Sequence, residues 1–334
     1  MGCPKKFLCA IPLGFAVGIS IFMFCVRHQL GVPTASSAWI AELIDRKLRA
    51  AEAISKPKIL LLGGSATLFG LKASMLESEL AVPVVNGGLH AGLGMEAILR
   101  EGKKMLREGD TVVLFPEYEL LNYGEKNRRD WAAITYLDFM LSRGAKHYLE
   151  LPFFDQLEIA LMTPPDRIWE GIKGRWFPKP LMSGSDYNPY EAAWISPHGD
   201  MSGHLAVRRP QQAEDRDQRL CEVLREGLTL EEEGLTLISD FKRWADARGV
   251  RVLAGFPNMI DRPAYQKAMV DGTESQLRSF YSNIQIQVIG TLRDSLLPKN
   301  DFFDTIYHPT EEASQQISKR VAVQLRPLLK ADGE

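Results

Sequence analysis

The segment KILLLGGS, residues 58–65, is a continuous apolar run that ends in two glycines and a serine. A short run of this kind, without polar alternation, is typical of a strand that is buried on both faces of a parallel sheet. Gly63 and Gly64 allow the chain to turn tightly as it leaves the strand. The segment therefore predicts a buried β-strand with Ser65 at its carboxyl end.

Further apolar runs along the chain also resemble strands, at 82–88, 111–115, 251–257 and 284–290. Helical spacing of apolar residues predicts helices in other segments, at 71–80, 91–110 and 235–249, with a last helix from Thr310 to about Leu329. Strands that alternate with helices indicate an α/β fold with a mainly parallel sheet, which we expect to form a three-layer sandwich.

The alternation is interrupted between about residues 120 and 213, where aromatic residues and proline are frequent. We interpret this stretch as an insertion of helices and loops that packs over one end of the sheet. The segment 58–330, which includes this insertion, has the length of one large domain.

The composition narrows the choice of partners. The chain has 334 residues, 45% of them hydrophobic, and a formal net charge of −2. A nucleic-acid-binding surface needs a basic excess to pair with phosphates, and none is present. We therefore expect no nucleic-acid partner.

The N-terminal segment predicts a membrane anchor. Residues 7–26 carry no charge, and as a helix they are about 30 Å long, which matches the core of a bilayer. Lys5 and Lys6 precede the run, and this charge bias favours a cytoplasmic N-terminus. The main domain then lies outside the cytoplasm.

Other fates of the N-terminus fit the sequence less well. A cleaved signal peptide has a shorter apolar core and a small-residue cleavage site, whereas this run ends in Phe-Cys-Val-Arg. A lipoprotein signal needs small residues before its cysteine, but Cys25 follows Met-Phe, and Lys6 stands where myristoylation needs Ser or Thr. We favour an uncleaved anchor over 1–30, followed by a helical connector over 31–57.

Cysteine usage agrees with this division of the chain. Cys3, Cys9 and Cys25 lie in or beside the anchor, and only Cys221 lies in the main domain. No disulfide can therefore form within that domain. We also expect no cofactor.

Residues with catalytic chemistry gather where predicted strands end. Ser65 follows the first strand, Gly88 follows the second, and Asp304 and His308 precede the last helix in FFDTIYHPTEEA, 302–313. Open parallel sheets bind ligands at the carboxyl ends of their strands. A hydroxyl nucleophile, an imidazole base and a carboxylate that orients the base are the parts of Ser-His-Asp catalysis. We predict a catalytic triad of these three side chains, with the N–H groups of Ser65 and Gly88 as the oxyanion hole.

This arrangement resembles the SGNH (GDSL-like) hydrolase superfamily. In that family a serine follows the first strand, a glycine follows the second, and an Asp-x-x-His pair precedes the last helix. The resemblance covers about 58–330 and implies a flavodoxin-like parallel sheet, with Ser65, Gly88, Asp304 and His308 in the family's roles.

With its N-terminal anchor, the chain is similar to the membrane-anchored branch that acylates bacterial cell-surface polymers. That branch includes the D-alanyl transfer protein of teichoic acid assembly and polysaccharide O-acetylation proteins. The similarity implies a single-pass protein of the bacterial cytoplasmic membrane, with its main domain in the periplasm. It also implies a polytopic membrane-bound O-acyltransferase as acyl donor and a polysaccharide as acceptor.

Two features depart from the family pattern. The Asp304–His308 pair has a step of four residues in place of three, and Asp301 is a weaker substitute for Asp304. The third strand is followed by Pro116-Glu117-Tyr118-Glu119, without the family's oxyanion asparagine before Asn122. The loss of one oxyanion-hole hydrogen-bond donor costs about 3 kcal/mol of transition-state stabilisation.

These motifs leave three functions open. The first is an extracytoplasmic O-acyltransferase, most simply an O-acetyltransferase, that works through a Ser65 acyl-enzyme. The second is a carbohydrate esterase with the same triad and water as the acceptor. The third is a non-catalytic subunit that scaffolds an acylation or export complex.

Several other polar residues are candidates for the lining of a substrate cleft: His90, Glu117, Tyr118, Asp200 and His204. The spacing of His198, Asp200 and His204 also permits a metal site, but the segment supplies only three ligands and a polar loop is the favoured interpretation. For Glu117 and Glu119 we expect one side chain to face the site and the other to face solvent, because alternate residues of an extended segment point to opposite sides.

Overall fold

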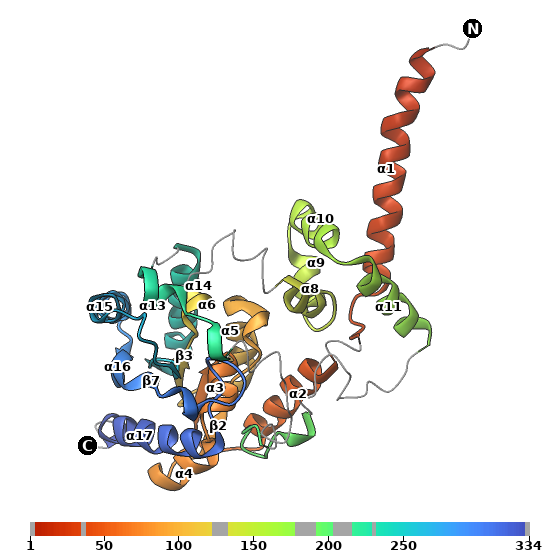
Figure 1. The fold of residues 1–334 in the computed structure, drawn as a ribbon. Helices are drawn as coiled ribbons and strands as arrows, with labels where there is room; N and C mark the ends of the chain where they lie inside the picture. The colour runs from red at the N-terminus through yellow and green to blue at the C-terminus, as the bar shows by residue number, and fades with distance from the viewer. Residues whose placement is uncertain are drawn as a thin grey trace.

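A computed structural model describes residues 4–34, 38–121, 133–177, 192–202, 216–228 and 232–330. Its main sheet has five parallel strands in the order β2-β1-β3-β4-β6 (Figure 1). The strands are β1 (Ile59–Gly63), β2 (Val84–Asn86), β3 (Thr111–Phe115), β4 (Arg251–Ala254) and β6 (Gln287–Val288). The prediction of an α/β fold with a mainly parallel sheet is confirmed.

Alternate residues of β1 belong to two separate cores, one on each face of the sheet. Leu60 and Leu62 join a cluster that includes side chains of α5 (Gly94–Met105) and α14 (Glu232–Asp246). Burying each such leucine contributes about 2 kcal/mol to stability. This pattern accounts for the continuous apolar sequence of the strand, because both of its faces are covered.

The opposite face has its own smaller core. Ile59 and Leu61 pack there with side chains of α4 (Ala73–Leu80) and α17 (Glu311–Lys330). Helix α17 lies along α4 in Figure 1, so the last helix of the chain covers the same face as the helix between β1 and β2.

The strand order reverses at β1. The chain passes from β1 to β2 on one side and then returns past β1 to β3 on the other, with β1 paired in parallel to both. At such a reversal the helices that follow β1 and β3 leave toward opposite faces, and ligands bind between them. Ser65 follows β1 and Glu117 follows β3, so both lie at this point.

Some elements differ from the sequence-based expectation. Ser65 begins a separate short helix, α3 (Ser65–Gly70), ahead of α4. A long helix, α15 (Lys267–Asn283), and a small second sheet of β5 (Met259–Ile260) and β7 (Leu296–Leu297) were not expected. The shorter elements are α6 (Tyr118–Leu121), α13 (Glu222–Glu226), α16 (Leu292–Ser295), η1 (Ala91–Leu93), η2 (Ala192–Trp194) and η4 (Lys299–Asp301).

The N-terminal region forms two helices, α1 (Pro4–His28) and α2 (Ala38–Glu52). Within the described part of the chain, α1 is the one helix that is long and apolar enough to cross a membrane, and its most apolar window is Ile11–His28. Helix α1 projects away from the main domain in Figure 1, whereas α2 packs against α5 and β2.

The described part of the insertion is helical, with α8 (Ala133–Leu141), α9 (Ala145–Glu150), α10 (Phe153–Met162) and α11 (Pro165–Trp176). Helix α8 contacts η1, which follows the carboxyl end of β2, but α10 and α11 contact α1. The insertion therefore reaches from the edge of the sheet to the apolar N-terminal helix (Figure 1), and does not simply cover one end of the sheet.

Candidate active site

Ser65 is the first residue of α3 and directly follows the turn that ends β1. Its side chain is partly exposed, and neither its hydroxyl nor its N–H has a hydrogen-bond partner among the described residues. A serine at the beginning of a helix is close to the positive end of the helix dipole. The structure thus presents a free hydroxyl and a free N–H at the carboxyl end of β1.

His308 and Asp304 form a buried pair in spite of their spacing. His308 Nδ1 lies 2.8 Å from Asp304 Oδ1, and both side chains are more than nine-tenths buried. The loop between them closes because the Phe303 N–H donates to the His308 carbonyl at 2.8 Å. A carboxylate at Nδ1 holds the proton there and leaves Nε2 as the basic nitrogen. The step of four residues is therefore compatible with the expected roles.

Helix α3 packs directly against the histidine. The ring centroids of Phe69 and His308 are 4.1 Å apart, and a Cβ added at Gly70 would lie 3.5 Å from Pro309 Cγ. Ser65 is four residues before Phe69, so both lie on the same face of the helix, one turn apart. Ser65 and His308 are not hydrogen-bonded here; such contacts are often longer before substrate binds.

Glu117 is the main feature of the site that sequence reasoning misplaced. We expected it to line a cleft, but it is buried and accepts hydrogen bonds from Gly64 N–H at 3.0 Å and Ala66 N–H at 2.7 Å. Burial raises the pKa of Glu117 to about 7, although the two N–H donors act against this shift. A Cβ at Gly64 would lie 2.5 Å from the carboxylate, so this glycine is needed for the contact.

Gly88 does not supply a free oxyanion donor. Its N–H donates to Asn86 Oδ1 at 2.9 Å, so the predicted role of Gly88 in the oxyanion hole is not supported by this structure. Glycine is needed at position 88 for a different reason. The Cβ of any other residue would lie 2.4 Å from the backbone nitrogen of Leu68 in α3. Gly88 thus allows the loop after β2 to touch the helix that carries Ser65.

Asn86 joins that loop to α3 and was not predicted as a site residue. Its side-chain amide donates to the carbonyls of Thr67 at 3.0 Å and Leu71 at 2.8 Å. Because its Oδ1 also holds Gly88, one buried side chain fixes both the loop and the helix. The only sequence signal was its place at the end of a strand, in VVNGG.

Lys47 reaches the same loop from the connector helix α2. Its buried Nζ donates to the Asn86 carbonyl at 2.7 Å, to Asn86 Oδ1 at 3.2 Å and to the Gly199 carbonyl at 2.9 Å. Burial lowers the pKa of Lys47 to about 7, and the charge of Asp200 partly opposes that shift. The connector is therefore attached to the site by a buried side chain.

The other predicted cleft residues have structural contacts. His90 is partly exposed, accepts the Gly92 N–H at 3.0 Å and stacks edge-on against Trp39. Tyr118 is buried, which raises the pKa of its hydroxyl, so it does not line an open cleft. His204 lies outside the described residues.

Asp200 is also buried and does not line a cleft. It accepts hydrogen bonds from the Ala73 N–H at 2.5 Å and from the N–H and hydroxyl of Ser74. These are the first free N–H groups of α4, so Asp200 caps that helix from a distant part of the chain. Within the described ranges, no group of three His, Cys, Asp or Glu side chains is placed to hold a metal ion.

Glu119 fixes the loop that carries His308. Tyr307 Oη donates to Glu119 Oε2 at 2.5 Å, and Arg219 lies 3.7 Å from the same carboxylate. We had expected either Glu117 or Glu119 to face solvent. Because α6 begins at Tyr118, the segment is not extended, and both carboxylates instead hold parts of the site.

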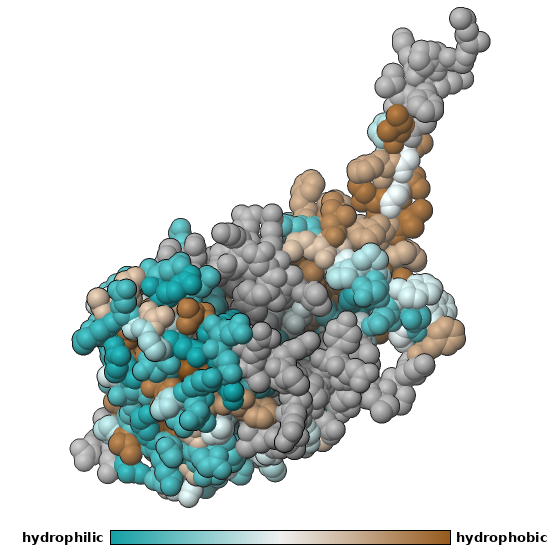
Figure 2. Space-filling view, in the orientation of Figure 1, coloured by the Kyte–Doolittle hydropathy of each residue, from teal (hydrophilic) through white to brown (hydrophobic). Residues whose placement is uncertain are grey.

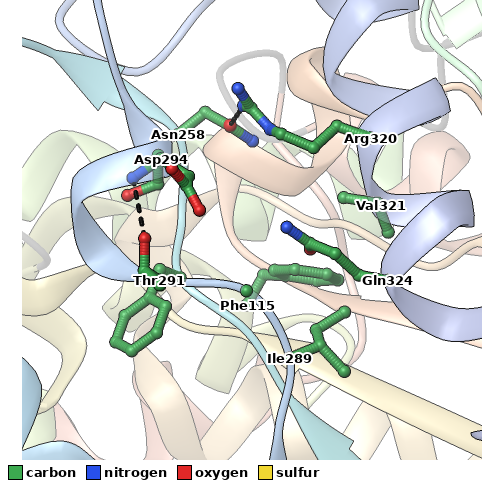
Figure 3. Close-up of a pocket in the computed structure, with 11 residues that line it drawn as sticks. Phe115, Asn258, Ile289, Thr291, Asp294, Arg320, Val321 and Gln324 are labelled. Carbon is green, nitrogen blue, oxygen red and sulfur yellow. Dashed lines mark hydrogen bonds between the residues drawn. The ribbon is translucent and has the colours of Figure 1, made fainter.

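A small cavity lies between the strand ends and α17, with Asn258 and Arg320 in its lining (Figure 3). Arg320 donates to Asn258 Oδ1 at 3.2 Å at its edge. The cavity volume is about 20 Å³, which is room for about one water molecule. Its lining includes none of Ser65, Asp304 and His308, so it is not the substrate pocket of the predicted site.

Comparisons with protein-family models, with curated proteins and with solved structures found no match to this chain. The resemblance to the SGNH family therefore stays an interpretation of the sequence.

Proposed function

We propose that this chain is a membrane-anchored, extracytoplasmic O-acyltransferase of the SGNH type. The observation that carries the proposal is the free hydroxyl of Ser65, one helical turn from Phe69, which packs on the His308 of a buried Asp-His pair. A nucleophile on one element and an oriented base on another are the parts that acyl transfer through an acyl-enzyme needs.

The arrangement of the sheet supports this family. The strand order β2-β1-β3-β4-β6 is the 2-1-3-4-5 order of flavodoxin-like doubly wound folds. A helical layer covers each face, as in a three-layer sandwich, and the candidate nucleophile follows β1 at the reversal of strand order.

In the proposed reaction, Ser65 Oγ attacks the carbonyl carbon of the acyl donor and its proton passes to His308 Nε2. The bond between the acyl carbon and the donor's leaving atom then breaks, and that atom takes the proton from Nε2. An ester on Ser65 remains. A sugar hydroxyl next attacks this ester and gives its proton to Nε2, and Ser65 Oγ recovers that proton as it leaves. Asp304 stabilises the imidazolium at each step.

The incomplete oxyanion hole fits a reactive, delivered acyl donor better than a fast general esterase. The Ser65 N–H is free, but the Gly88 N–H is held by Asn86 and the flanking N–H groups of Gly64 and Ala66 are held by Glu117. One missing donor costs about 3 kcal/mol in the transition state. Such a site suits a reactive acyl group delivered by a partner.

The proposed location follows from α1. A helix of this length and hydropathy serves as the single membrane anchor, with the N-terminus in the cytoplasm and the main domain outside it. The proposed donor is a polytopic membrane-bound O-acyltransferase that brings acyl groups across the bilayer, and the proposed acceptor is an exported or cell-surface polysaccharide.

A fluorophosphonate probe tests the central claim. The full chain in detergent micelles is treated with the probe beside Ser65→Ala and His308→Ala, and the adduct is located by mass spectrometry. We expect an adduct on Ser65 that both variants lose. Absence of labelling, both alone and in a preparation co-expressed with its acyltransferase partner, would favour the non-catalytic scaffold.

A second measurement separates transferase from esterase. The chain is given an aryl acetate with and without an oligosaccharide acceptor. Transfer gives an acetylated sugar and speeds release of the phenol, whereas a carbohydrate esterase gives acetate at a rate that the acceptor does not increase.

A further inference from the structure

The exposed large hydrophobic side chains are concentrated in two neighbouring parts of the chain. Within the described residues, six such side chains lie on α1 and seven lie between 149 and 177, and only Val323 lies elsewhere. Figure 2 shows hydrophobic surface that continues from α1 onto the helices packed at its lower end, while the main domain is largely hydrophilic. The seven are Leu149, Phe153, Phe154, Leu161, Trp169, Trp176 and Phe177.

Helix α11 presents an aromatic and basic stripe to solvent. Trp169, Lys173 and Trp176 are spaced four and three residues apart, which places them on one face of the helix. The Lys173 ammonium lies 5.8 Å from the centroid of the Trp169 ring. Tryptophan and lysine together are the residues that membrane proteins place at the boundary between lipid and water.

Helices α10 and α11 hold the carboxyl-terminal end of α1. Arg175 of α11 donates to the carbonyls of His28 at 3.0 Å and Leu30 at 2.6 Å. The Trp176 ring lies 5.6 Å from the His28 ring. From α10, Gln156 accepts a hydrogen bond from Arg27 at 3.2 Å. These contacts fix both insertion helices at one end of α1.

The same contacts set the depth of α10 and α11. The apolar window of α1 ends at His28, and the first side chains of this window that are buried against the protein are Met23 and Val26, while Phe24 between them stays exposed. Six residues of helix span about 9 Å, so α10 and α11 lie beside the last 9 Å or so of the window. A bilayer around α1 would therefore reach their outer surfaces at its headgroup boundary.

We infer that α10 and α11 form an interfacial foot that inserts its exposed aromatic side chains into the outer edge of the bilayer. The inference rests on the proposed anchoring of the chain by α1. A lipid surface is the occupant that the geometry fits, because lipid surrounds a single anchor on every side and any helix packed on its end must meet that lipid. The foot would hold Ser65 at a fixed height above the membrane, within reach of the proposed membrane-bound acyl donor.

The accessibility of nitroxide spin labels to reagents in lipid and in water tests whether the foot lies in the bilayer. The full chain, with Cys3, Cys9 and Cys25 replaced by alanine, is reconstituted in phosphatidylethanolamine and phosphatidylglycerol vesicles. Cys221 remains, because burial raises its pKa to about 12 and such a thiol does not react. Single cysteines carry the spin label.

The probe positions are Phe154→Cys on α10 and Trp169→Cys on α11, which are 79% and 60% exposed. Val323→Cys on α17 is the matched control, an apolar residue that is 62% exposed and far from α1. Val17→Cys on α1 reports the anchor itself. At each site the relaxing effect of oxygen, which concentrates in lipid, is compared with that of a water-soluble nickel complex.

We expect the oxygen-to-nickel ratio at 154 and 169 to be several-fold higher than at 323 and to approach that at 17. A ratio at 154 and 169 equal to that at 323, with a high ratio at 17, would overturn the foot and leave the anchor intact. Shielding of 154 and 169 from both reagents would mean that protein covers them, which also overturns it. A low ratio at 17 would overturn the anchor, and the foot with it.

Discussion

Lys47 donates from a fully buried ammonium group to both oxygens of Asn86, at 2.7 Å to the carbonyl and 3.2 Å to Oδ1. The connector that leaves the proposed membrane anchor is thereby joined to the side chain that positions Gly88 and the end of α3. A displacement of α2 would therefore act on α3 and on the loop after β2 through Lys47 and Asn86.

Replacing Lys47 by methionine should destabilise the fold. The change removes the Lys47 donor from the Asn86 and Gly199 carbonyls and leaves Asn86 Oδ1 with only the Gly88 N–H, and we expect the free energy of unfolding to fall by about 3 kcal/mol. Chemical denaturation of the purified chain in detergent measures this. The matched control is Lys267→Met, an exposed lysine in a surface ion pair, which should change stability by less than about 0.5 kcal/mol. Equal effects of the two substitutions would contradict the buried role of Lys47.

Glu117 should make stability depend on pH. Its pKa is about 7 in the folded chain and 4.5 as the unperturbed value, so between these values the folded state binds the extra proton. The stability of the wild type should therefore fall as pH rises through this window. Relative to Glu117→Gln, which has no such proton, we expect the wild type to lose about 2–3 kcal/mol between pH 5 and pH 8. Denaturation of both proteins at the two pH values measures the difference, and a constant difference would refute the assignment.

Asp304→Asn should slow the reaction of Ser65 with the fluorophosphonate probe by about 10³-fold or more, because the amide no longer holds the proton on Nδ1 of His308. The labelling reaction is quenched at a series of times, and mass spectrometry measures the labelled fraction of the protein at each time. Asp301→Asn is the control, since this neighbouring acid is the alternative partner in the sequence but the structure pairs His308 with Asp304. If the Asp301 variant were the slower of the two, the observed pair would not be the functional one.

Gly88→Ala should disturb α3 and lower labelling of Ser65. The new Cβ would lie 2.4 Å from a backbone nitrogen, which a side-chain rotation cannot relieve. We expect a loss of about 1–3 kcal/mol in unfolding free energy together with slower labelling. Gly272→Ala, where no heavy atom lies within 4 Å of the new Cβ on helix α15, should instead stabilise the chain by up to about 1 kcal/mol. Loss of stability in both variants would show that packing at Gly88 is not the cause.

The strands and the pairing of Asp304 with His308 could be predicted because their signals are local. An apolar run that ends in Gly-Gly-Ser predicts both β1 and the position of Ser65, and His308 and Asp304 belong to one loop. Asn86, Lys47 and Glu117 could not be placed in the same way. Each acts on a backbone group that is distant in sequence, such as Glu117 on Gly64 and Ala66, and no spacing rule predicts such a contact.

The sequence alone also did not decide why a glycine stands at position 88. A glycine after a strand leaves its N–H uncovered for a ligand, or it allows another backbone to approach closely. At Gly88 the second explanation holds, because α3 occupies the space of a side chain and Asn86 takes the N–H. Helix α15 was missed although its buried residues Val270, Thr273, Leu277 and Tyr281 have helical spacing.

The packing of the insertion helices against α1 has a consequence for folding. Met23, Val26 and Gln29 are buried, and Gln29 accepts a hydrogen bond from Arg167, which is paired with Asp138 at 2.7 Å. Removal of the first thirty residues would leave Arg167 without its Gln29 partner. It would also expose the apolar surface of the insertion that packs against α1. Helix α1 is thus part of the folded structure, and the core of the insertion is complete only when α1 is in place.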